Sequence, residues 1–178
     1  MKAASFENGQ PAGKLTSTDV MAHKAFASPV KLGAAPNKAY RGNGALTLVD
    51  GLKGTLSHGD GHWLGFQNDD LVATVDLKKA TEISSVRSTF LQKPEDEILL
   101  PTAVEVAVST DGRTYKTVYS GPVPAAPAGA SIGEVKADWK KTKARYVRVT
   151  AKNAQAAKAT AGTKDATAWL FADELVVQ

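Results

Sequence analysis

The feature that most constrains the fold is a recurring two-residue alternation of apolar and polar side chains. In residues 71–77, Leu, Ala, Val and Leu alternate with Val, Thr and Asp. In residues 104–108, Val alternates with Glu and Ala. This period places one apolar face on a β-strand, so both segments are predicted to be strands with one buried face.

Turn-forming residues separate these strands from others along the chain. The sequence Ser-Thr-Asp-Gly at 109–112 predicts a turn, and 115–119 is its expected hairpin partner. The three prolines of 121–129 exclude a central strand there. Residues 152–167, rich in Ala and Lys, are interpreted as a mobile loop. Further strands are predicted at 15–20, 30–32, 83–91, 132–137, 145–150 and 169–177.

Length and composition limit the domain count and the class of partner. A chain of 178 residues with almost no helical periodicity predicts one all-β domain, an antiparallel β-sandwich or jelly roll, at 29–178. Residues 1–28 are interpreted as a leader or linker from an upstream domain. Because there is no Cys, disulfides and thiolate metal sites are excluded. The net charge of +4 is spread along the chain, so no nucleic-acid partner is expected, and no apolar run approaches the roughly 20 residues of a membrane span.

A glycine-rich loop in residues 45–66 suggests a cation site. An apolar run ends at Asp50, and Thr55 supplies a further oxygen five residues later. The sequence Asp173-Glu174 is an acidic pair set in an apolar strand. Carboxylate, hydroxyl and carbonyl oxygens are the ligands that calcium prefers, so Asp50 and Glu174 are predicted to meet at a structural calcium site. The alternative is that Asp50 only forms a turn and Glu174 is a solvated strand residue.

The order of short motifs resembles one known family. These motifs are LVDGLKG, WLGF, ATVDL, FL followed by Pro101, VAVSTDG, ARYVRV and WLFADEL. Together they resemble the discoidin or coagulation factor type C domain, a galactose-binding-like fold that includes the family 32 carbohydrate-binding modules. The sequence is most similar to the C-terminal module of secreted bacterial family 20 β-N-acetylhexosaminidases, and MAHKAFASPVKL is similar to the linker that precedes it.

The resemblance implies a non-catalytic accessory module, secreted or located in the periplasm or at the cell surface. Its expected partners are a glycan and an upstream catalytic domain of the same polypeptide, and the module itself is expected to be a monomer. The structural calcium that the family implies would be held by Thr47, Asp50, Leu52, Thr55 and Glu174, with the carbonyls of Thr47 and Leu52 among the ligands.

The glycan site is predicted on loops at one end of the sandwich. Sugar-binding sites stack an aromatic ring on the apolar face of a sugar and surround it with planar polar groups. The family often uses His, Arg and Asn; here the Arg is missing, although Lys93 stands on the corresponding loop. Trp169 is a candidate platform that could instead share the buried face of Phe171, whereas Trp63 is predicted to lie in the core. The candidate ligand-binding residues are His58, His62, Gln92, Lys93, Glu95 and Trp169.

Three other functions were weighed against sugar binding. His58, Asp60 and His62 have ligand types suited to a transition metal, but the glycines between them leave them unpositioned. No GxSxG elbow is present, and the adjacent carboxylates of 95–97 point apart, so no catalytic residue is predicted. The remaining alternative is a structural module that docks on its parent hexosaminidase without binding sugar.

Overall fold

The computed structural model describes residues 2–3, 6–12, 16–17, 20–154 and 168–178. Of the strand predicted at 15–20, residues 16–17 form a two-residue strand, and 15, 18 and 19 lie outside the described residues. The mobile loop predicted at 152–167 lies outside them beyond residue 154. Short 3-10 helices are η1 (Lys38–Tyr40), η2 (Gly44–Leu48) and η3 (Pro94–Asp96). The strands are β1 (Lys2–Ala3), β2 (Phe6–Glu7), β3 (Gln10–Pro11), β4 (Thr16–Ser17), β5 (Val30–Leu32), β6 (Leu64–Gln67), β7 (Leu71–Gln92), β8 (Ala103–Ser109), β9 (Lys116–Pro122), β10 (Ser131–Lys152) and β11 (Trp169–Val177).

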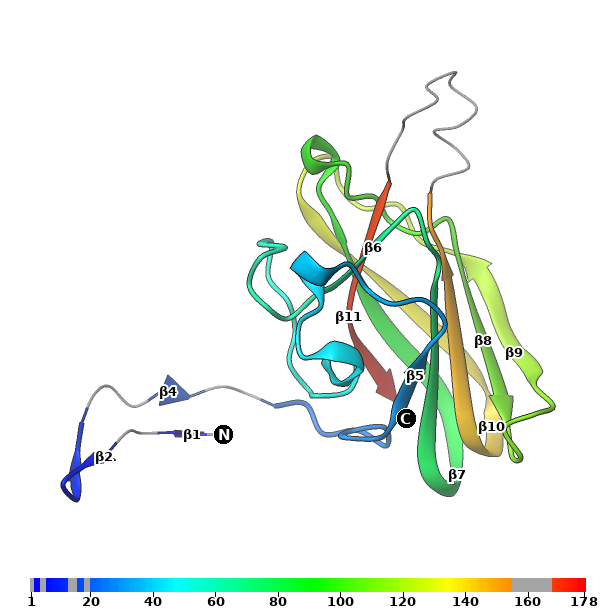
Figure 1. The fold of residues 1–178 in the computed structure, drawn as a ribbon. Coiled ribbons are helices and arrows are strands. Elements are labelled where there is room, and N and C mark those ends of the chain that lie inside the picture. The colour runs from blue at the N-terminus through cyan, green and yellow to red at the C-terminus, as the bar shows by residue number, and fades with distance from the viewer. Residues whose placement is uncertain (1, 4–5, 13–15, 18–19, 155–167) are drawn as a thin grey trace.

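The strands form an antiparallel β-sandwich in which β7 and β10, 22 residues each, run through both layers (Figure 1). In the front layer, the first part of β7 pairs with β5 and with the second part of β10, followed by β8 and β9. In the back layer, the second part of β7 pairs with the first part of β10 and with β11, which pairs with β6. The predicted sandwich class is confirmed.

The structure joins segments that the sequence separates. The predicted strands 71–77 and 83–91 are one strand, and so are 132–137 and 145–150. Between the two parts of β7, Lys78 has a positive φ of 68° and Lys79 is exposed. The register of β10 against β7 shifts at the same place, between Ala144 and Tyr146. Polar, solvated residues at a bend look like loop residues in the sequence, which explains the difference.

The core between the layers follows the predicted period. Leu71, Ala73 and Val75 are fully buried, and the intervening residues are only half-buried. Trp63, predicted to be a core residue, is 1% exposed and packs with Leu91, Ile98 and Phe171 in a second cluster. The Trp63 side chain is also fixed by a hydrogen bond from Nε1 to the Thr55 carbonyl at 3.0 Å.

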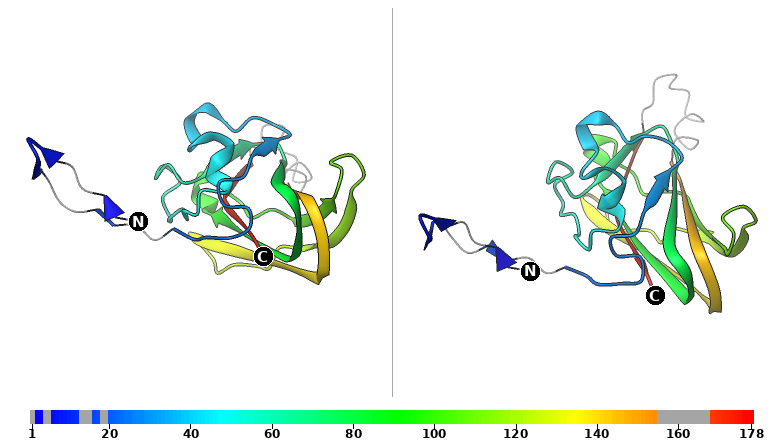
Figure 2. Two further views of the ribbon diagram at one scale, coloured as in Figure 1. Left: turned by 90° about the horizontal axis from the view of Figure 1, so that it is seen from below. Right: turned by 60° about the horizontal axis from the view of Figure 1, so that its bottom comes forward.

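Part of the segment that the sequence assigned to a leader packs against the sandwich. Ala25 is fully buried, and the Lys24 N–H donates to the Val177 carbonyl at 3.0 Å. The Ala27 N–H donates to the Val49 carbonyl at 2.8 Å. Figure 2 shows this segment running beside the C-terminus. Within the described residues, no helix has the length and apolar character required to cross a membrane.

Gly54 should tolerate no side chain. A Cβ added there would lie 2.1 Å from Cε2 of the buried Trp63 indole. We expect Gly54→Ala to lower the free energy of unfolding by about 2–3 kcal/mol, measured by chemical denaturation.

Gly59 in the same loop is the matched control, because nothing lies within 4 Å of its added Cβ. We expect Gly59→Ala to change stability by less than about 0.5 kcal/mol. Equal effects of the two substitutions would contradict the close packing of Gly54 on Trp63.

Candidate functional site

A small cavity lies where β11 begins. Its volume is about 250 Å³, and it is lined by Tyr40, His58, Asp96, Ile98, Trp169 and Phe171, which we call the aromatic hollow. Ile98 and Phe171 are buried, whereas the Trp169 and Tyr40 side chains are partly exposed. The hollow therefore has an apolar base and aromatic walls that reach solvent.

The aromatic rings contact one another edge to face, which holds them in fixed orientations. Tyr40 lies 5.3 Å from Trp169, 5.0 Å from Phe171 and 5.4 Å from His58, measured between ring centroids. Each such pair stabilises the fold by about 0.5–1.5 kcal/mol beyond the contribution of its buried surface area. Tyr40 is positioned by η1, since the Asn37 N–H before this helix donates to the Gly65 carbonyl of β6 at 2.8 Å.

Polar groups stand at the opening of the hollow. Lys93 Nζ lies 2.6 Å from Asp96 Oδ2, and this hydrogen bond is the main cause that lowers the pKa of Asp96 and raises that of Lys93. His58 Nδ1 lies 3.5 Å from the same Asp96 oxygen and has no hydrogen-bond partner, although the atom is buried. The hollow thus offers an ionised carboxylate and a ring nitrogen without a partner.

The predicted glycan residues occupy different places. His58 and Trp169 lie in the hollow, and Lys93 reaches its opening through Asp96. Gln92 Nε2 instead donates to the Pro127 and Gly129 carbonyls, at 2.8 and 3.1 Å, and braces the proline-rich loop. Glu95 is exposed on η3, where its charge contributes to raising the pKa of Lys93. His62 lies close to Asp50, where it partly offsets the rise in the Asp50 pKa that burial causes.

Sequence reasoning missed Tyr40 as a site residue and did not single out Asp96. Tyr40 is distant in sequence from Trp169 and meets it only because η1 is held on β6. Asp96 follows Lys93 by three residues, and this spacing was the available signal.

In the middle of β11, Asp173 and Glu174 form what we call the acidic bulge. The pairing of β11 with β7 shifts register between Ala172 and Leu175, and both acidic residues are 1% exposed. Asp173 Oδ2 accepts the Gly54 N–H and Glu174 Oε2 accepts the Gly51 N–H, each at 3.0 Å. The acidic bulge therefore binds the backbone of the glycine-rich loop directly.

His23 completes this contact and was not predicted. Its Nδ1 accepts the N–H groups of Ala25 and Val177, both at 3.3 Å, so the ring proton resides on Nε2. Nε2 donates to Glu174 Oε1 at 2.6 Å, and both side chains are fully buried. The histidine thus supplies a buried hydrogen bond to Glu174.

The residues around Asp50 partly fit the calcium ion that the family resemblance implies. Burial is the largest cause that raises the pKa of both Asp50 and Glu174, and the charge of Asp50 raises that of Glu174 further. Two mutually repelling carboxylates suit a hard cation. The Leu52 backbone lies beside the Asp50 carboxylate, because the Leu52 N–H donates to Asp50 Oδ1 at 2.9 Å.

The Thr55 hydroxyl, an implied calcium ligand, has another partner, because it donates to Asp60 Oδ2 at 2.8 Å. Thr47, implied as a ligand through its carbonyl, uses its hydroxyl to accept the Asn43 N–H at 2.7 Å. Calcium bound by Asp50 and Glu174 would therefore take further ligands from backbone carbonyls or water.

The transition-metal alternative does not fit the geometry. Asp60 uses its carboxylate to accept N–H groups of Thr55 and His62, at 2.6 and 2.9 Å, while His58 faces the aromatic hollow. Across the part of the chain that the structure describes, no three His, Asp or Glu side chains gather as metal ligands.

The antiparallel β-sandwich described above is the fold of the discoidin class of domains. Residues 33–169 match the model of the F5/8 type C domain, and the chain belongs to this family. The resemblance inferred from the motifs is thus confirmed at the level of the domain. No curated protein matches the chain.

Solved structures with this fold include several carbohydrate-binding modules. Chitosan-binding module 1 of a chitosanase/glucanase from Paenibacillus sp. IK-5 has a TM-score of 0.59 and 15% identity, covering 89% of this chain and 99% of that chain. The CBM32 of AlyQ, solved with 4,5-unsaturated mannuronic acid, has a TM-score of 0.55 and 17% identity, covering 86% and 96%. A CBM32 from Clostridium perfringens, solved with GalNAc-β-1,3-galactose, has a TM-score of 0.52 and 17% identity, covering 84% and 93%.

The buried carboxyl group of Asp173 predicts a pH-dependent stability. Burial raises its pKa from 3.8 to about 6, so the folded protein holds this proton more tightly than the unfolded chain. The resulting stabilisation is present below about pH 4 and is lost as the pH rises through 6. We expect the free energy of unfolding of the wild type, relative to Asp173→Asn, to fall by about 2–3 kcal/mol between pH 4 and 7.

Denaturant unfolding of both proteins across this range measures the effect. Thr89→Val removes a hydroxyl that donates to Asp173 Oδ1 and should steepen the dependence, because that bond favours the ionised form. Parallel pH profiles for wild type and Asp173→Asn would contradict the raised pKa.

Proposed function

We propose that this chain is a non-catalytic carbohydrate-binding module of a secreted glycoside hydrolase, and that the aromatic hollow binds its glycan. The observation that carries the proposal is a pocket whose walls are the rings of Tyr40 and Trp169, with an ionised Asp96 beside them. Solved relatives described with GalNAc-β-1,3-galactose or as chitosan-binding support a galactose- or N-acetylhexosamine-containing ligand.

The hollow has the features needed for weak sugar recognition. The indole of Trp169 and the phenol ring of Tyr40 offer apolar surface to the C–H face of a pyranose. Asp96 accepts hydrogen bonds from sugar hydroxyl groups. A volume of about 250 Å³ holds one terminal sugar, so the affinity rests on few contacts.

Weak binding is sufficient for an accessory module. When a module and an enzyme share one polypeptide, the tether raises the effective concentration of the enzyme near its polymer. We assign the parent enzyme to the β-N-acetylhexosaminidases on the motif resemblance, with the catalytic domain upstream and the whole protein secreted or held in the periplasm or at the cell surface.

A second candidate function is docking on the parent enzyme without sugar binding. It is favoured by the absence of the arginine that the family often has on the Lys93 loop. Lys93 itself is already engaged in a hydrogen bond with Asp96. The two functions differ in whether the isolated module binds glycans.

Trp169→Ala should abolish glycan binding. Removal of the indole deletes the stacking surface while the buried Phe171 beneath it remains. We expect at least a tenfold loss of affinity on a glycan array or in affinity electrophoresis, followed by titration with the best glycan. Asp96→Asn should weaken binding without abolishing it.

Phe26→Ala is the matched control, because Phe26 is an aromatic residue, 41% exposed, outside the hollow. It should bind as the wild type does. Absence of binding to any glycan by the folded wild-type module would overturn the proposal and favour docking.

We further propose a structural calcium ion between Asp50 and Glu174. A ligand that binds only the folded state stabilises it, by about 2.7 kcal/mol at a hundredfold excess over Kd. Calcium should therefore raise the Tm, a strong chelator should lower it, and Asp50→Asn should remove both responses. Asp60→Asn is the control, because Asp60 bonds to Thr55 and His62. A wild-type Tm unaffected by calcium and chelator would contradict the calcium site.

A further inference from the structure

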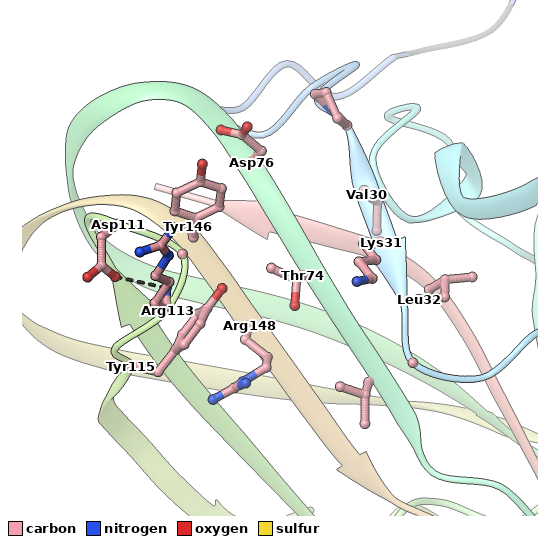
Figure 3. Close-up of a pocket in the computed structure, with 14 residues that line it drawn as sticks. Val30, Lys31, Leu32, Thr74, Asp76, Asp111, Arg113, Tyr115, Tyr146 and Arg148 are labelled. Atoms are coloured by element: carbon pink, nitrogen blue, oxygen red, sulfur yellow. Dashed lines mark hydrogen bonds between the residues drawn. The ribbon is translucent and has the colours of Figure 1, made fainter.

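A second and larger cavity lies on the outer face of the front layer (Figure 3). It has a volume of about 590 Å³, within the roughly 300–1,000 Å³ of small-molecule sites. β7 and β10 form its floor, β5 forms one wall, and the turn between β8 and β9 forms the other. We call it the basic groove. It shares no lining residue with the aromatic hollow.

Three polar side chains cross the basic groove in one row. Lys31 of β5 is in register with Thr74 of β7, and Thr74 is in register with Arg148 of β10. Residues paired in this way point to the same face of the sheet, and neighbouring strands lie about 4.8 Å apart. Lys31 and Arg148 therefore flank the Thr74 hydroxyl from two sides.

Arg148 is held in place but has no acceptor. Its guanidinium carbon lies 3.9 Å from the ring centroid of Tyr115, and the side chain is half-buried. Among the described residues, none accepts a hydrogen bond from the side chains of Arg148, Lys31 or Arg113. Stacking fixes the plane of the guanidinium, so its donors are oriented before any ligand arrives.

The acidic side chains of the basic groove are already neutralised or engaged. Asp76 accepts two hydrogen bonds from Arg145, both at 2.8 Å. Asp111 accepts the N–H groups of Arg113 and Thr114, at 2.8 and 2.9 Å, and these bonds lower its pKa to about 2. Lys31, Arg113 and Arg148 therefore leave an excess of positive charge in the cavity.

The wall formed by the β8–β9 turn is rigid. Gly112 has a φ of 74°, and a Cβ at this position would lie 3.1 Å from the ring of Tyr146 on the groove floor. The Ser109 hydroxyl accepts the Gly112 N–H at 2.9 Å and closes the turn. A turn packed on the floor in this way keeps Tyr115 and Arg113 beside the cavity (Figure 3).

We propose that the basic groove is a second binding site, for an acidic oligosaccharide that carries a uronic acid carboxylate. The planar fork of Arg148 matches a carboxylate in two parallel hydrogen bonds, and Lys31 neutralises it from the other side. Thr74 and the phenol groups of Tyr115 and Tyr146 bond the sugar hydroxyls. This site does not depend on the function of the aromatic hollow.

Calorimetric titration of the whole chain with digalacturonate tests the site. We expect saturable binding that falls at least tenfold in Arg148→Ala and severalfold in Lys31→Ala. Arg148→Lys should give an intermediate affinity, because lysine keeps the charge but lacks the fork. Thermal unfolding of each variant establishes that it is folded. Trp169→Ala, in the aromatic hollow, should bind digalacturonate as the wild type does.

Lys143→Ala is the matched control, since it removes one exposed positive charge from β10 outside the basic groove. It should leave the affinity unchanged. An equal loss in Lys143→Ala and Arg148→Ala would show unspecific charge attraction and overturn the site. No binding of digalacturonate, equal binding of its carboxyl-reduced neutral form, or equally effective competition by inorganic sulfate would also overturn it.

Discussion

The contact on which the structure most depends joins two backbone amides of the glycine-rich loop to the two carboxylates of the acidic bulge. Burying a carboxylate is costly unless it is hydrogen-bonded, and here the Gly51 and Gly54 N–H groups supply those bonds. The loop, fixed in this way, packs Trp63 into the core and presents His58 to the aromatic hollow. The two hydrogen bonds between the glycine-rich loop and β11 therefore help to form the candidate site.

The two bent strands, β7 and β10, give the sandwich a second constraint. Because each strand belongs to both layers, the layers cannot slide past each other without breaking the pairing between them. The outward residues of the front layer form the floor of the basic groove, while β11 in the back layer supports the aromatic hollow. The floor of the basic groove therefore consists of regular strands, which hold side chains more precisely than loops do. Only Trp169 and Phe171 of the aromatic hollow come from a strand.

Much of the fold could be predicted from local pattern. The alternation in 71–77 identified a strand with one buried face, and the motif order identified the family. The bends in β7 and β10 were missed because exposed residues at a bend resemble a loop. In the candidate site, Trp169 and His58 were found by residue type. Tyr40 and His23 were not, since their contacts lie far away in sequence and arise only from tertiary packing.

The hydrogen bond between Lys24 and Val177 places the point where the chain joins the sandwich beside the end of β11. Trp169 begins the same strand, roughly 25 Å away at the rise of an extended chain. Lys24 and the aromatic hollow therefore lie at opposite ends of β11. A domain attached ahead of Met21 would therefore lie at the end of the sandwich opposite to the aromatic hollow.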